Sequence, residues 1–139
     1  MGKSLYLCGP MDSVSKEEQT SWRNYAKDYL IQIGISSIDP CIRPHSKDCS
    51  LSDKEIVQQD LLDVEKADFL LVDARHRDKS MYGTPIEVFY ANHILGKPTI
   101  GWYDEEHGYN DNSIFQNVFL SNRFPSLDEA LDHIGCYYA

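Results

Sequence analysis

The sequence predicts an α/β fold in which a parallel sheet lies between two layers of helices. Short apolar runs alternate with segments of helical periodicity along the chain, which is typical of strands joined by helical crossovers. The run DFLLVD at 68–73 is apolar up to its final carboxylate, as expected of a strand buried on both faces of a sheet. We therefore expect one domain over residues 1–139, a three-layer flavodoxin-like or Rossmann-like sandwich with a five-stranded, mainly parallel sheet.

The first half of the chain is predicted to contain two strands and two helices. Apolar residues recur at helical spacing up to Ile33, and Gly34 stands where a C-terminal cap is expected. Ser52 and Glu55 match a capping box, in which each side chain bonds a free backbone N–H at a helix start. The expected elements are strands at 4–8 and 35–38 and helices at 15–33 and 52–66.

The second half is predicted to contain three strands and two helices. Thr84 and Glu87 form another capping-box pattern, with Pro85 at the first helical position. Ser126 and Glu129 repeat the pattern near the C-terminal end of the sequence. The expected elements are strands at 68–73, 98–102 and 118–120 and helices at 84–95 and 126–134.

The charge balance excludes some classes of partner. The chain has 13 Lys+Arg against 22 Asp+Glu, a net charge of −9, whereas binding to a nucleic acid polymer depends on basic side chains that neutralise phosphates. The apolar stretches are too short to span a bilayer, and the run at 5–8 is too short for a signal-peptide core. We expect a cytoplasmic protein with a small-molecule ligand and no membrane contact.

The four cysteines contain no CxxC pair, so reduced thiols are expected. Cys41, His45 and Cys49 form a Cys-x3-His-x3-Cys pattern, but a zinc site needs a fourth ligand and usually has tighter cysteine pairing. We expect an irregular loop there and no metal.

The carboxyl ends of the strands form the edge at which ligands bind in such sheets. The turn after the first strand, Asp73 at the end of the third, and Glu87 at the start of the next helix are expected to meet there. The phosphate-binding patterns GxGxxG and GxxxxGK[ST] are both missing, which argues against dinucleotides and triphosphates as ligands.

Three stretches resemble the nucleoside 2-deoxyribosyltransferase family and its relatives, the 2′-deoxynucleoside 5′-monophosphate N-glycosidases. These stretches are YLCGPM at 6–11, DLLDVEKADFLLVDA at 60–74 and SMYGTPIEVFYANHILGKPTI at 80–100. The resemblance covers residues 5–102. It implies that Glu87 is the nucleophile that attacks C1′ of the sugar, that the Tyr6 hydroxyl orients Glu87, and that Asp73 handles the base. It also implies a homo-oligomer.

The residue types fit that chemistry. A helix N-terminus favours the ionised form that a carboxylate nucleophile needs, and Glu87 is expected in the first helical turn. Two carboxylates are the usual apparatus for cleaving a glycosidic bond through a covalent intermediate. Burial of Asp73 would disfavour its charge, so we expect it to share a proton with the leaving base. Alternatives are that Glu87 only caps its helix, Asp73 only caps a loop, and Tyr6 only packs in the core.

The expected substrate-binding residues border the same edge. The related monophosphate hydrolases have Ser and a basic residue after the first-strand glycine, whereas this chain has Pro10 and Asp12, which favours unphosphorylated nucleosides. Ser80 replaces the aspartate that the transferases carry before the nucleophile. Basic residues that leave phosphate binding open are Arg43, Arg75, Arg77 and Lys79. The complete expected binding set is Gly9, Pro10, Met11, Asp12, Ser80, Tyr82 and Gly83.

These observations predict an enzyme that cleaves the N-glycosidic bond of 2′-deoxynucleosides and passes the deoxyribosyl group from Glu87 to another nucleobase. No cofactor is expected, because a carboxylate nucleophile needs none. The first alternative is an N-glycosidase that hydrolyses 2′-deoxynucleosides or their 5′-monophosphates to the free base. The second is a non-catalytic nucleotide-binding module in which Glu87 only caps its helix.

Overall fold

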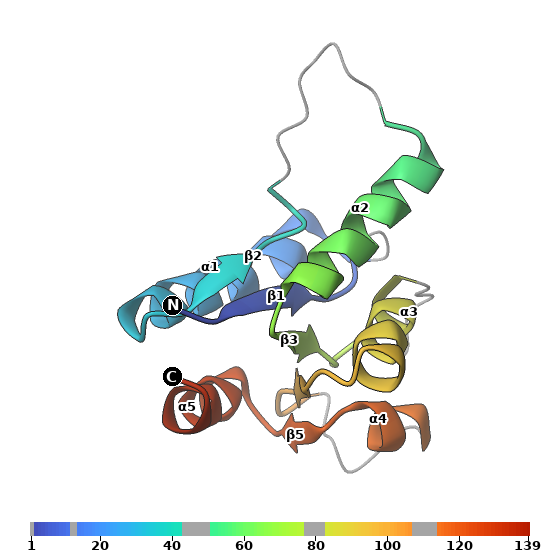
Figure 1. Cartoon of the computed structure of the whole chain (residues 1–139). Coiled ribbons are helices and arrows are strands. Elements are labelled where there is room, and N and C mark those ends of the chain that lie inside the picture. The colour runs from blue at the N-terminus through green and yellow to red at the C-terminus, as the bar shows by residue number, and fades with distance from the viewer. Residues whose placement is uncertain (1, 12–13, 43–50, 77–82, 107–113) are drawn as a thin grey trace.

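Five parallel strands form one sheet in the order β2-β1-β3-β4-β5 (Figure 1). The computed structural model describes residues 2–11, 14–42, 51–76, 83–106 and 114–139. The strand order is that of flavodoxin-like folds, so the predicted fold class is confirmed, and every strand pair is parallel. The strands are β1 Ser4–Cys8, β2 Ser36–Ile38, β3 Phe69–Asp73, β4 Thr99–Trp102 and β5 Asn122–Phe124.

Helices cover both faces of the sheet. The helices α1 and α5 pack together on one face, and α2 contacts α3 on the other (Figure 1). A π-helical segment, η1, continues α3 directly and is closed by a bond from the Leu95 N–H to the Tyr90 carbonyl. The bounds are α1 Lys16–Gln32, α2 Asp53–Lys66, α3 Gly83–Phe89, η1 Tyr90–Ile94, α4 Ile114–Phe119 and α5 Leu127–Tyr137.

Side-chain alternation along the strands sorts the core into two clusters. On the face that α1 and α5 cover, here called the α1/α5 face, Leu7 and Leu71 pack with helix residues such as Trp22 and Leu131. On the opposite face, here called the α2/α3 face, the strand residues pack with Val64 of α2, Val88 of α3 and Ala91 of η1. Strand residues of the α2/α3 face are Tyr6, Cys8, Leu70 and Val72.

Side-chain caps define several helix starts, and two glycines define helix ends. The Ser52 hydroxyl accepts from the Glu55 N–H and the Glu55 carboxylate accepts from the Ser52 N–H, so the predicted capping box is confirmed. The Ser126 hydroxyl accepts from the Glu129 N–H and caps α5, but the Glu129 carboxylate does not return the bond, so only one half of the predicted capping box is confirmed. Gly34 and Gly96 have φ of 77° and 66°, a conformation that glycine adopts without a steric penalty at helix C-termini.

The capping box predicted at Thr84 and Glu87 is wrong. Helix α3 begins at Gly83, so Thr84 lies inside its first turn, and the Thr84 hydroxyl is buried without a hydrogen-bond partner. Glu87 is the fifth residue of the helix, and its carboxylate points into the α2/α3 face instead of back to the helix start. The interpretation of Glu87 as a helix cap is therefore excluded.

The strand predicted at 118–120 is also wrong. Val118 lies in α4, and the last strand is β5, which begins at Asn122. The strand β5 is at the edge of the sheet, where polar residues such as Asn122 and Arg123 are tolerated, so it lacks the apolar pattern that marks buried strands. Leu120 instead packs over β4, where a Cβ on Gly101 would lie 2.6 Å from Leu120 Cδ1.

Among the helices in the described parts of the chain, none is long and apolar enough to cross a membrane.

Candidate active site

Glu87 and Tyr6 meet on the α2/α3 face of the sheet. The Tyr6 hydroxyl, from β1, donates a hydrogen bond of 2.7 Å to Oε2 of Glu87, from α3. Both residues are buried, with Glu87 8% and Tyr6 1% exposed. Tyr6 therefore packs in the core and also binds the carboxylate, so its two suggested roles coincide in one side chain.

Cys8 is a second donor to the same carboxylate and is not among the site residues predicted from the sequence. Its Sγ lies 3.6 Å from Oε1 of Glu87, within the range of a weak S–H donor. Residues two apart in a strand point to the same face, so Tyr6 and Cys8 approach Glu87 from neighbouring positions of β1. Each oxygen of the Glu87 carboxylate thus has its own donor.

Burial controls the protonation of this cluster. Desolvation raises the pKa of Glu87 to about 7, while the hydrogen bonds from Tyr6 and Cys8 lower it. Burial and the neighbouring Glu87 charge raise the pKa of the Tyr6 hydroxyl and of the Cys8 thiol, so both stay neutral donors near pH 7. The prediction that a helix N-terminus favours the ionised form of Glu87 is wrong. Glu87 lies beyond the first helical turn, and desolvation, which favours the neutral form, is the largest influence on its pKa.

Asp60 of α2 is a second acidic residue near Glu87 and is not among the site residues predicted from the sequence. Its negative charge raises the pKa of Glu87 and of Tyr6. Asp60 is half-buried, on the helix that contacts α3. Asp60 lies within the 60–74 stretch that carries the resemblance, but a charged residue on an amphipathic helix gives no signal of which side it faces.

Asp73 does not join this cluster. It follows Leu71 by two residues in β3 and therefore points to the α1/α5 face, opposite Glu87. Its carboxylate is 1% exposed and accepts two bonds from the Arg75 guanidinium, of 2.9 Å and 3.0 Å, and one of 3.1 Å from the Arg75 N–H. His76 Nε2 lies 3.6 Å from the same carboxylate. The two carboxylates expected to act together are thus on opposite faces of the sheet.

Arg75 is held by more than one group. Besides Asp73, it lies 3.7 Å from the Asp104 carboxylate, and its guanidinium is 4.3 Å from the centre of the Trp102 ring, within cation–π range. This basic side chain was one of those considered for phosphate binding. Its charge is already matched by two carboxylates of the chain.

Part of the expected binding set borders these groups. A Cβ on Gly9 would lie 3.0 Å from both Asp73 Cβ and a Trp22 ring carbon, so only glycine fits this turn without displacing its neighbours. Pro10 is buried, Met11 is half-buried, and Gly83 begins α3. Outside the described residues are Asp12, Ser80 and Tyr82, and with them Arg43, Arg77 and Lys79.

The described residues contain no group of three or more histidine, cysteine or acidic side chains that could hold a metal ion. Cys41 is half-buried beside Asp39, whose carboxylate accepts the Cys41 N–H at 2.8 Å. The two other members of the Cys-x3-His-x3-Cys pattern, His45 and Cys49, lie outside the described residues.

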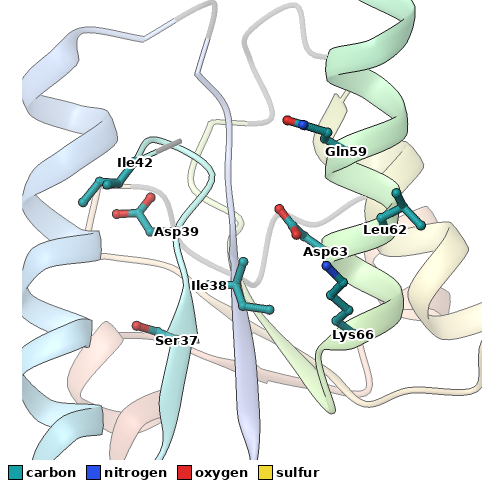
Figure 2. Close-up of a pocket in the computed structure, with 8 residues that line it drawn as sticks. All are labelled: Ser37, Ile38, Asp39, Ile42, Gln59, Leu62, Asp63 and Lys66. Atoms are coloured by element: carbon teal, nitrogen blue, oxygen red, sulfur yellow. The ribbon is translucent and has the colours of Figure 1, made fainter. Parts of the chain in front are cut away.

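A groove of about 500 Å³ lies between the edge strand β2 and α2. Figure 2 shows Gln59 and Asp63 pointing from α2 toward the strands. The lining residues that α2 contributes are at positions 59, 62, 63 and 66, whereas Asp60 is turned about 100° from residue 59 around the helix axis. None of Tyr6, Cys8 and Glu87 lines the groove.

The comparisons with known proteins show the fold. No family model and no curated protein matches the sequence. Solved structures do match, at low sequence identity. A conserved protein from Enterococcus faecalis V583 has 16% identity over 96% of this chain and 98% of its own, with a TM-score of 0.74.

Two further solved structures are enzymes by name. The 2-deoxyribosyltransferase from Bacillus psychrosaccharolyticus is 21% identical over 93% of this chain and 90% of its own, with a TM-score of 0.67. The CMP N-glycosidase BcmB of Clostridium botulinum is 16% identical over 97% of this chain and 99% of its own, with a TM-score of 0.64. The present chain therefore has the fold of these proteins over nearly its whole length.

Proposed function

We propose that this chain cleaves the N-glycosidic bond of 2′-deoxynucleosides and transfers the deoxyribosyl group to another nucleobase through a covalent ester on Glu87. The observation that carries the proposal is the buried Glu87 carboxylate with Tyr6 bonded to Oε2 at 2.7 Å. The residue resemblance supports it, as does a fold shared with a 2-deoxyribosyltransferase and a CMP N-glycosidase.

The proposed reaction has two displacement steps at C1′ of the sugar. In the first, a bond forms between an Oε atom of Glu87 and C1′, and the C1′–N bond breaks with its electron pair on the base, which takes up a proton. In the second, a nitrogen of the acceptor base attacks C1′, loses a proton, and releases the carboxylate. Burial that disfavours the Glu87 charge favours the neutral ester, and a pKa of about 7 leaves a substantial ionised fraction at neutral pH.

A second acidic group is needed near the leaving base. The resemblance gives this role to Asp73, which is ion-paired with Arg75 on the α1/α5 face. Asp60, in contrast, is on α2, which covers the α2/α3 face where Glu87 lies, and its charge raises the pKa of Glu87. We therefore assign Asp60 to the base and propose that the Asp73–Arg75 pair supports the turn at Gly9.

The proposed substrates are unphosphorylated nucleosides. A 5′-phosphate dianion needs cationic or N–H donors, and the Arg75 charge is already matched by Asp73 and Asp104. Pro10 also stands where a serine is usual in the related monophosphate hydrolases.

Incubation of pure protein with deoxyinosine and free adenine tests the proposal. Chromatography should show deoxyadenosine with the wild type and with Glu17→Ala, which removes an exposed glutamate of α1. Glu87→Ala should reduce the rate by about a thousandfold or more, since the covalent nucleophile is gone.

Each other outcome contradicts part of the proposal. Free hypoxanthine without deoxyadenosine would identify a hydrolase, and the assay would then be repeated with deoxynucleoside 5′-monophosphates. Unchanged substrate in both assays, with nucleotide binding retained in Glu87→Ala, would identify a binding module.

We also propose a homo-oligomer, because exposed apolar side chains gather on the helices around Glu87. Such patches on soluble proteins commonly mark contact surfaces. Sedimentation equilibrium should give a mass at least twice 16.0 kDa, and a monomer at micromolar concentration would refute this part. The exposed side chains are Ile86, Phe89, Ile94, Ile114, Phe115 and Val118.

A further inference from the structure

Both oxygens of the Glu87 carboxylate are held by side chains of one strand. The Tyr6 hydroxyl lies 2.7 Å from Oε2, and the Cys8 thiol lies 3.6 Å from Oε1. A carboxylate with one donor can still rotate about its last C–C bond, whereas separate donors to its two oxygens fix the plane of the group. The Cys8 contact therefore fixes the plane of the carboxylate, which the Tyr6 contact alone does not do.

We propose that Cys8 is a positioning residue for Glu87, whose thiol holds Oε1 while Tyr6 holds Oε2, so that the carboxylate plane is fixed before substrate binds. The kinetic part of this inference rests on the proposed function, in which Glu87 is the nucleophile. Displacement at C1′ needs an aligned oxygen, and small errors in alignment are costly in rate.

The chemistry of a buried thiol suits this role. Cys8 is fully buried, and the pKa of its thiol is raised, chiefly by burial and by the Glu87 charge, so it stays a neutral donor. A thiol is a weak donor, so it orients the oxygen without holding its lone pairs as strongly as a hydroxyl does. Cys8 itself is not proposed as a nucleophile, because the reactive form of cysteine is the thiolate.

The position of Cys8 on β1 makes the contact stiff. β1 is paired with β2 on one side and with β3 on the other, and Cys8 is in register with Val72 of β3. A side chain on a central strand has little freedom to drift relative to its neighbours. Its donor therefore has a defined place relative to Glu87.

The test compares Cys8→Ser, which keeps a donor, with Cys8→Val, which keeps apolar volume and a β-branched shape that suits a strand. A packing role ranks Val above Ser in activity, whereas a positioning role ranks Ser above Val. We expect Cys8→Val to lower kcat about three- to tenfold with KM changed less than about twofold, and Cys8→Ser to recover most of the loss. Cys136→Ala, at an exposed cysteine, controls for thiol loss.

Titration of Glu87 tests the contact apart from the reaction. The charged or titratable groups that act on Glu87 are Tyr6, Cys8, Asp60 and Arg23, and of these only the donor at Cys8 changes in the variants. Carbon-13 NMR of the Glu87 carboxyl, assigned with Glu87→Gln, should show a higher pKa in Cys8→Val than in the wild type, because a donor to the charged form is lost.

The two measurements separate failure of the inference from failure of the proposed function. Equal kcat in Cys8→Val and the wild type, or a Val variant more active than the Ser variant, would overturn the positioning role. If the wild type showed no turnover, the proposed function would fail and the titration would decide alone. A Glu87 pKa unchanged in Cys8→Val would then overturn the inference, and a raised one would support it.

Discussion

The free energy of unfolding of Glu87→Gln, relative to that of the wild type, should be higher at pH 8 than at pH 5. Burial raises the pKa of Glu87 from 4.5 to about 7 in the folded state, whereas the unfolded chain has an ordinary glutamate. A raised carboxyl pKa means that the folded state binds more protons than the unfolded state between these values. The contribution of Glu87 to the stability of the folded state is therefore fully present below about pH 4.5 and is lost as the pH rises through 7.

The size of the effect on stability follows from the difference between the pKa values of Glu87 in the folded and unfolded states. Ionised Glu87 costs the folded wild type about 3 kcal/mol at pH 8 and less than about 1 kcal/mol at pH 5. Glutamine keeps the shape of the side chain and a carbonyl oxygen for the Tyr6 hydroxyl, and it has no charge to desolvate. A change in packing that does not depend on pH alters the unfolding free energy equally at pH 5 and pH 8, so it cancels when the two values are compared.

Urea unfolding at pH 5, 6, 7 and 8 measures this effect. The difference in unfolding free energy between Glu87→Gln and the wild type should move in favour of the variant by about 2 to 3 kcal/mol across the series. Glu55→Gln is the matched control: it removes an exposed glutamate whose pKa is lowered by its cap contacts, so its titration is complete below this range. A Glu87→Gln difference that stays constant within about 0.5 kcal/mol would refute the burial argument.

Three further predictions use the neighbours of Glu87 and the Asp73–Arg75 ion pair. Tyr6→Phe removes a donor and should move the acidic limb of the pH–rate profile up by about one pH unit. Asp60→Asn removes a negative charge and should move the same limb down by roughly half a unit. Shifts of the same sign in both would contradict the assignment. Arg75→Met leaves the buried Asp73 carboxylate without its guanidinium partner, and should lower the urea unfolding free energy by about 2 to 3 kcal/mol. Arg75→Lys should recover only part of the loss because it cannot form the two parallel bonds, and full recovery would argue against the bidentate pair.

The fold was predictable where local signals were strong. The apolar run of β3, the cap at Ser52 and the glycines at helix ends each predict an element that the structure contains. The last strand was missed because β5 is short, lies at the edge and carries Asn122 and Arg123, so neither composition nor alternation marks it. The nearby apolar residues belong to α4 and to the packing of Leu120 on Gly101.

The site was predictable only in part, for a reason that concerns the faces of the sheet. A strand that is apolar on both sides gives no indication of which face its final carboxylate occupies, so Asp73 was placed with Glu87. The structure shows that parity with Leu71 places Asp73 on the α1/α5 face. Cys8 was missed because a buried cysteine in an apolar strand gives no sequence signal apart from packing, although its spacing of two from Tyr6 indicated a shared face.

The placement of Tyr6 and Cys8 on an interior strand separates the two donors to Glu87 from the loops at the sheet edge. β1 has hydrogen-bonded neighbours on both sides, so backbone amides there should exchange with solvent only when the sheet opens. Loops at the sheet edge can change in length or sequence without moving these donors. For protein engineering, this means that loops at the sheet edge could be exchanged while the proposed nucleophile, Glu87, keeps its two donors.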